Sequence, residues 1–165
     1  MANHWLLKSE PEVYPFSQLV ADGRTTWDGV RNFEARNNLA AMAEGDFVLF
    51  YHSHVAEIVG VAKVTRTAFP DPTADDPRWR AVELAAQYAL DAPVSLETIK
   101  ADRAFSGLKL VTHSRLSVMP VAPAQFARIL ELAKSGPRSA KTAAAAGSSR
   151  SRAGRSRSDS PSRRR

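Results

Sequence analysis

The chain has 165 residues and a mass of 18.0 kDa, which is enough for one compact domain and one further segment. Its charge is unevenly divided. Residues 1–133 hold 13 Lys and Arg against 16 Asp and Glu, a net charge of −3, and residues 134–165 hold 10 against 1, a net charge of +9. Cysteine is absent, which excludes thiol catalysis, zinc–thiolate sites, iron–sulfur clusters and disulfides. No apolar run approaches the roughly 20 residues of a membrane span. We therefore expect an intracellular, cytoplasmic protein without a membrane partner, associated with the nucleoid or, in a eukaryote, with the nucleus.

The segment 134–165 predicts a disordered basic tail. Its only apolar side chains are alanines, so it cannot bury enough surface to offset the entropy of ordering it. Arginine alternates with serine toward its end, a composition that binds polyanions with little sequence preference. We expect the tail to contact nucleic-acid phosphates, with a merely solubilising extension as the alternative. The arginines concerned are Arg150, Arg152, Arg155, Arg157, Arg163, Arg164 and Arg165.

The first half of the chain alternates short strands and short helices. Residues 4–9 predict a strand that ends at Glu10-Pro11, and residues 16–21 a helix closed by Asp22-Gly23. A helix of about ten residues follows, with Asn32 as its N-cap. The apolar run 47–52 and the Val- and Thr-rich stretch 57–69 predict two strands.

The second half begins with a loop over residues 70–77, which contains three prolines and three aspartates. We interpret residues 78–90 as a strand, although their alanines would also suit a helix. Ser95 caps a short helix to residue 100, a helical turn spans 102–107, residues 114–121 form a strand, and a last helix runs from Pro123 to Gly136. The predicted fold class is α+β, with a small mixed sheet or barrel surrounded by short helices.

Signatures of catalysis and metal binding are weak. The sequence has no GxSxG, no glycine-rich phosphate loop and no HExxH. His52 and His54 would point to the same face of a strand, but a third ligand at a suitable spacing is missing. We expect no metal, no cofactor and no catalytic residue.

Polar side chains cluster at the ends of apolar segments, where binding sites are usually built. They form four groups, which are Lys8, Ser9 and Glu10; Trp27, Asp28, Arg31 and Asn32; Tyr51, His52 and Ser53; and Ser114 with Arg115. Taken one at a time, however, a tryptophan such as Trp27 is more often a core residue, and arginines such as Arg31 and Arg115 are more often salt-bridge partners.

Seven strings in order resemble the EVE domain family over residues 3–133. They are HWLLKSEP, WDGVRNFEARNNL, GDFVLFYHS, IVGVAKV, FPDPTADDPRW, PVSLETIKAD and SRLSVMPV. The family belongs to the PUA-like superfamily, so the resemblance implies a β-pseudobarrel of mixed strands with short helices around it. It also implies a pocket that accepts a flipped, often modified, nucleobase. We expect a monomeric domain.

The resemblance places the pocket at the four polar groups. Its residues would be Lys8, Ser9, Glu10, Trp27, Val30, Arg31, Asn32, Tyr51, His52, Ser53, Ser114, Arg115 and Ser117. Trp27 or Tyr51 could stack on the base, and polar groups could bind its Watson–Crick edge. Lys8, Arg31 and Arg115 could meet phosphates at the mouth of the pocket.

Two functions follow from this resemblance. The first is a non-catalytic reader of a modified or unpaired base in DNA or RNA. The alternative is a hydrolase of modified nucleosides, because similar PUA-like proteins of the ASCH type use a lysine and a glutamate, a pair that Lys8 and Glu10 could supply. No activated nucleophile is evident from the sequence, which favours the reader.

Overall fold

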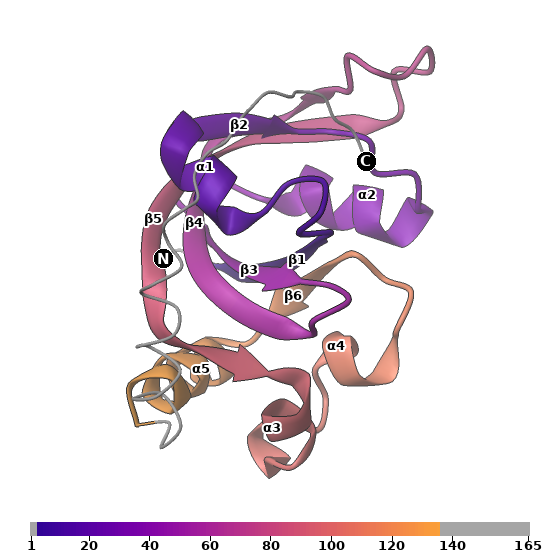
Figure 1. Ribbon diagram of the computed structural model, residues 1–165. Coiled ribbons are helices and arrows are strands. Elements are labelled where there is room, and N and C mark those ends of the chain that lie inside the picture. The colour runs from indigo at the N-terminus through magenta and orange to yellow at the C-terminus, as the bar shows by residue number, and fades with distance from the viewer. Residues whose placement is uncertain (1–2, 136–165) are drawn as a thin grey trace.

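One curved mixed sheet of six strands organises the residues that this computed structural model describes, 3–135 (Figure 1). The strand order is β2-β5-β4-β3-β1-β6. The parallel pair is β1 with β3, and the other neighbours are antiparallel. The strands are β1 (His4–Ser9), β2 (Arg24–Trp27), β3 (Phe47–His52), β4 (Glu57–Pro70), β5 (Arg80–Ser95) and β6 (Val118–Val121).

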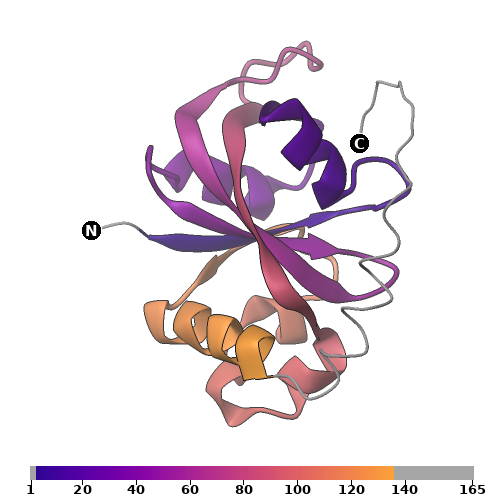
Figure 2. The same ribbon diagram turned by 60° about the vertical axis from the view of Figure 1, so that its left-hand side comes forward.

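Short helices gather at the two ends of the sheet. Helices α1 (Phe16–Asp22) and α2 (Phe33–Ala41) lie at one end, and α3 (Leu96–Lys100), α4 (Lys109–Thr112) and α5 (Pro123–Ser135) lie at the other (Figures 1 and 2). A 3₁₀ turn, η1 (Arg103–Phe105), joins α3 to α4. Asn32 and Ser95 cap α2 and α3 through their side chains, as the sequence predicts. Within residues 3–135, no helix has the length and apolarity needed to cross a bilayer.

Helix α2 lies across the gap between the two edges of the sheet. It packs against β6, which is one edge strand, and against β5, the neighbour of the other edge strand, β2. Asn38 in α2 donates a hydrogen bond from Nδ2 to the backbone oxygen of Val118 at 2.7 Å, so it occupies an acceptor that no further strand pairs. The curved sheet and this helix together form a pseudobarrel.

The register of β1 brings three polar segments to one place. Lys8 and Ser9 at the end of β1 pair with Tyr51 and His52 at the end of β3, because parallel strands finish at the same edge. On the other side, the Lys8 amide donates to the Ser117 backbone oxygen at 2.9 Å, just before β6 begins. The apolar residues of β1 and β3 are buried except Phe47, which is partly buried, since other elements cover both faces of these central strands.

The predicted α+β class, a mixed sheet in a pseudobarrel surrounded by short helices, is confirmed, and so is the choice of strand for β5. Two short elements, β2 and α4, were not predicted from the sequence. It also made the last strand too long. Residues 114–117 are not in β6, because a turn in which the Leu116 amide donates to the His113 oxygen at 3.1 Å occupies this segment. Helix α5 includes residues 134 and 135 of the predicted tail, and residues 136–165 lie outside the described part of the chain.

Gly60 in β4 provides a test of packing between the sheet and α1. A Cβ atom at Gly60 would lie 2.5 Å from two ring carbons of Phe16, a side chain that is itself buried. We expect Gly60→Ala to lower the free energy of unfolding by about 1 to 3 kcal/mol through overpacking, measured by urea denaturation. Gly107→Ala is the control, because a Cβ there meets nothing within 4 Å. Equal stabilities of the two variants would contradict the packing.

Candidate functional site

A cavity of about 300 Å³ lies between the start of α2 and the segment that joins α4 to β6. Three of its lining residues were predicted from the sequence, Asn32, Ser114 and Arg115. Three others were not, and they are Glu34, His113 and Leu116. Glu34 forms an ion pair with Lys109 of α4 at 2.7 Å, so this pair joins the two sides of the cavity.

Lys8 lies at the edge of this cavity. Its Nζ donates a hydrogen bond to the backbone oxygen of Ser114, a cavity residue, at 2.8 Å, and lies 5.9 Å from the ring centroid of Tyr51. Burial lowers the pKa of the Lys8 amine and raises the pKa of the Tyr51 phenol, because it disfavours the charged form of each. The hydrogen bond to Ser114 therefore fixes the Lys8 side chain beside the cavity.

Two charged side chains of the predicted site are exposed and unpaired within residues 3–135. Arg115 lines the cavity and forms no ion pair or side-chain hydrogen bond there. Glu10 follows β1, and its backbone oxygen accepts hydrogen bonds from the amides of Val13 and Tyr14 while its carboxylate makes none in this part of the chain. Both groups are therefore available to a ligand.

Three polar side chains of the predicted site, Ser9, His52 and Ser53, form hydrogen bonds with the backbone around β1 and β3. Ser9 donates from Oγ to the Tyr14 oxygen, and Ser53 donates to the Ser9 oxygen from its amide at 2.9 Å and from Oγ at 3.2 Å. His52 accepts a hydrogen bond at Nε2 from the Phe16 amide at 3.0 Å. Burial lowers the pKa of His52, in agreement with this neutral acceptor role.

His54 takes no part in a joint site with His52. Its imidazole Nδ1 lies 3.0 Å from a carboxylate oxygen of Glu12, in an exposed pair. In residues 3–135, no group of three or more His, Asp or Glu side chains is arranged to hold a metal ion.

Trp27 and Val30 are core residues in this structure. Trp27 is 3% exposed and packs edge-on against Phe50 at 5.6 Å and against Tyr14 at 5.8 Å between ring centroids. Val30 is 7% exposed. A base that stacks on Trp27 therefore has to displace a neighbouring side chain, and Tyr14, the less buried of the two rings, is the one nearer the surface.

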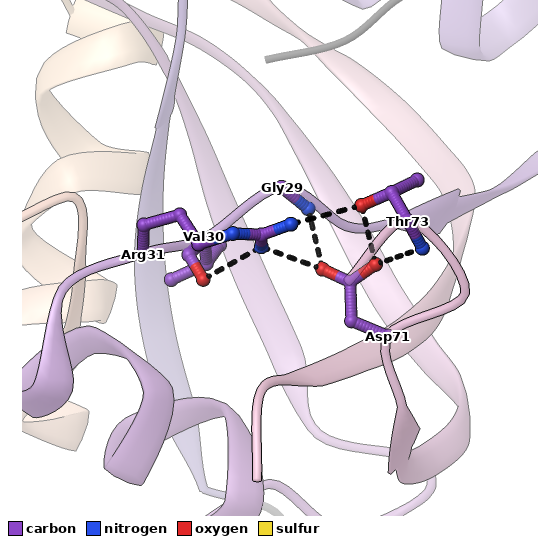
Figure 3. A network of polar contacts seen from close by, with 5 residues as sticks. All are labelled: Gly29, Val30, Arg31, Asp71 and Thr73. Atoms are coloured by element: carbon purple, nitrogen blue, oxygen red, sulfur yellow. Dashed lines mark hydrogen bonds and ion pairs between the residues drawn. The ribbon is translucent and has the colours of Figure 1, made fainter. Parts of the chain in front are cut away.

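Arg31 is directed to the β4–β5 loop by a buried carboxylate (Figure 3). The side chain of Asp71 has no exposed surface and accepts from Arg31 Nη1 at 2.9 Å. It also accepts from the Gly29 amide at 2.8 Å and from the Thr73 amide and hydroxyl at 2.7 and 2.6 Å. Burial alone would raise the pKa of Asp71, but these hydrogen bonds outweigh it and hold the pKa below its ordinary value.

The loop that contains Asp71 was predicted from the sequence, but the role of Asp71 was not. Its signal was an Asp two residues before a Thr in a proline-rich loop, a pattern typical of a local Asx turn. Only the fold shows that the same carboxylate also binds the segment of Gly29 and Arg31, 40 and more residues earlier. The cavity residues Glu34 and His113 carried no sequence signal, because they lie in ordinary polar stretches.

Comparison with known proteins decides the family. The EVE domain model matches residues 3–132. The chain belongs to the EVE domain family. It is 34% identical to mouse thymocyte nuclear protein 1, over 83% of this chain and 76% of that protein.

Two solved structures place this EVE domain among proteins of similar fold. The structure of human THYN1 in complex with DNA that contains 5-methylcytosine has a TM-score of 0.74, at 31% identity, over 81% of this chain and 98% of that chain. The YTH domain of Zygosaccharomyces rouxii MRB1, solved in complex with N6-methyladenosine RNA, has a TM-score of 0.53 at 17% identity, over 80% and 86% of the two chains. This second likeness concerns the fold alone.

Asp71 predicts a pH dependence for the stability of the EVE domain. Because its folded pKa lies below the ordinary value of 3.8, its ionised form stabilises the folded state at neutral pH, and this contribution is lost as the pH falls through the folded pKa. We expect Asp71→Asn to lower the free energy of unfolding by about 1 to 3 kcal/mol at pH 7. The difference from the parent should shrink below about pH 4.

Urea denaturation at a series of pH values measures this difference. Asp75→Asn is the control, because Asp75 is exposed on the same loop and forms no ion pair or side-chain hydrogen bond within residues 3–135, so its loss should leave stability nearly unchanged at pH 7. A difference between parent and Asp71→Asn that stayed constant from pH 7 to pH 3 would show that the charge of Asp71 is not the stabilising feature.

Proposed function

We propose that this protein is a non-catalytic reader of a modified base in nucleic acid, and that the base is bound at the meeting point of β1, β3, the start of α2 and the segment before β6. The observation that carries the proposal is the likeness to human THYN1, which was solved with DNA containing 5-methylcytosine and matches most of both chains at 31% identity. The geometry supports it, because Arg115, which has no ion pair in residues 3–135, and Asn32, whose Nδ2 group is not used in capping α2, both line a cavity at that point.

The phosphates next to the base would contact Lys8 and Arg115. The Lys8 ammonium is fixed on the Ser114 oxygen, and Arg115 is exposed beside it without an ion pair in residues 3–135. Arginine and lysine at such positions set the register of a strand without reading its sequence. Arg31 attracts the phosphates of the nucleic acid less strongly, because the Asp71 carboxylate already pairs with its guanidinium.

The base would be read by polar groups of the cavity and by Glu10. Asn32 uses Oδ1 to cap α2 by accepting from the Ala35 amide at 2.9 Å, which leaves its Nδ2 group for a ligand. The unpaired Glu10 carboxylate can accept a hydrogen bond from the exocyclic amino group of cytosine or adenine. In this proposal, five further residues support the groups that contact the base: Ser9, Tyr51, His52, Ser53 and Ser117. Trp27 and Val30 form an apolar wall, which a base reaches when the Tyr14 side chain moves.

The arginines of residues 150–165, which lie outside the described part of the chain, would add affinity for any polyanion. A hydrolytic role for Lys8 and Glu10 finds no support in the geometry. The Lys8 amine donates to a backbone oxygen, and no hydrogen bond joins it to the Glu10 carboxylate within residues 3–135.

The exposed Arg115 leads to a prediction about how the affinity for nucleic acid depends on salt concentration. We expect Arg115→Ala to weaken binding of single-stranded oligonucleotides with and without 5-methylcytosine equally, and to reduce the slope of log affinity against log salt by about one. Fluorescence anisotropy over a salt series measures both quantities. Arg103→Ala is the control, because Arg103 is also exposed but lies on η1 and does not line the cavity. Identical slopes for the two variants would remove Arg115 from the interface.

The Glu10 carboxylate leads to a prediction about which base the protein prefers. 5-Methylcytosine and thymine share the methyl group and differ in their polar edge, so they isolate the contact with the exocyclic amino group. We expect Glu10→Gln to narrow the affinity gap between oligonucleotides carrying these two bases by about 1 to 3 kcal/mol. Glu44→Gln, on the exposed turn before β3, is the control. A parent protein that binds both oligonucleotides equally would contradict the proposed reading of 5-methylcytosine.

A further inference from the structure

An exposed aromatic ring lies beside the cavity and has no role in the site described above. Phe33, the first residue of α2, is 64% exposed, which is the greatest exposure of any large hydrophobic side chain in residues 3–135. Its two chain neighbours, Asn32 and Glu34, both line the cavity. Phe33 therefore lies directly between two residues of the proposed base site in the chain.

The Phe33 ring is held in a fixed orientation. It stacks on the Trp79 ring of the β4–β5 loop, with centroids 5.2 Å apart and an angle of 15° between the planes. The Arg36 guanidinium lies 5.1 Å from the Phe33 ring and 5.6 Å from the Trp79 ring, and Arg31 lies 5.7 Å from the Trp79 ring. Single exposed hydrophobic residues are ordinary on protein surfaces, but a ring fixed by a second ring and by cations is a preorganised flat surface.

The charge beside this surface suits a nucleotide. Arg36 donates hydrogen bonds to the neutral side chain of Asn37 at 3.1 and 3.3 Å and forms no ion pair in residues 3–135. A nucleotide offers a flat base for the ring and a phosphate for the guanidinium, and stacking on an aromatic side chain accepts any of the bases. Apolar peptides would gain nothing from the arginine.

We propose that Phe33, supported by Trp79 and Arg36, is a stacking platform for an unpaired nucleotide next to the base that is read in the cavity. This inference rests on the proposed function and extends it, because it assigns the substrate as a single strand, or a locally unpaired strand, of at least two nucleotides. The platform contributes affinity that does not depend on sequence, whereas the cavity contributes base preference.

The test compares Phe33→Ala, Phe33→Trp and the parent, each as the full chain. The probes are two single-stranded DNA 12-mers, one with a central 5-methylcytosine and one with cytosine, measured by fluorescence anisotropy at about 0.2 M salt to weaken non-specific ionic binding. We expect Phe33→Ala to weaken binding of both probes by about 5- to 100-fold and to leave their affinity ratio unchanged. Phe33→Trp should retain the parent affinity.

Val20→Ala is the matched control, because Val20 is 55% exposed on α1 and outside the platform. Its affinity should equal that of the parent. Thermal melting of all variants should agree closely, since Phe33 contributes little buried surface. Parent affinity in Phe33→Ala would overturn the platform, and so would a change in oligomeric state of Phe33→Ala on size exclusion without a change in affinity, because the ring would then be a contact between copies of the chain.

The outcomes separate this inference from the proposed function. If the parent binds both probes equally and Phe33→Ala weakens both, the platform holds and the reading of 5-methylcytosine falls. If the parent prefers the methylated probe and Phe33→Ala has the parent affinity for each, the reader holds and the platform falls. If the parent binds neither probe, both the stacking platform and the proposed reader function are contradicted.

Discussion

The pairing of β1 with strands on both sides is the constraint on which the site depends. β1 runs parallel to β3 and antiparallel to β6, so its last residues meet the end of one strand and the approach to the other. Segments that are more than 40 and more than 100 residues away in sequence are thereby placed around Lys8. A slip of one residue in β1 would turn its alternate side chains to the opposite faces and separate Lys8 from Ser114.

Two buried carboxylates fix the loops around this central strand. Asp46 accepts hydrogen bonds from the Trp5 indole at 2.9 Å and from the amides of Asn3 and Ala43 at 3.0 and 2.9 Å, so it ties the start of β1 to the turn before β3. Asp71 does the same for the segment before α2 and the β4–β5 loop. Each carboxylate satisfies several backbone donors that would otherwise be buried without partners, which explains why the loops around the site keep a defined shape.

The sequence predicted the strands of the centre well, because β1 and β3 are continuous apolar runs with polar ends and turn residues around them. It missed β2 and α4, since four residues are too few to show a period of 2.0 or 3.6. Among the predicted site residues, those at strand ends, such as Lys8 and Tyr51, are brought together by register. Trp27 is different. The same aromatic side chain suits a binding wall or a core, and only the packing against Phe50 and Tyr14 shows that it is buried here.

The gap between the two edges of the sheet also bears on how the protein avoids aggregation. Its two outer strands, β2 and β6, have four residues each, and Pro120 in β6 has no amide hydrogen to donate to an incoming strand. Asn38 of α2 already occupies the Val118 oxygen on the same outer side. A second chain therefore finds almost no backbone template for adding a strand, although the barrel is not closed by hydrogen bonds. Helix α2, which carries cavity residues, can therefore lie across this gap without the edge-to-edge association that an open sheet usually brings.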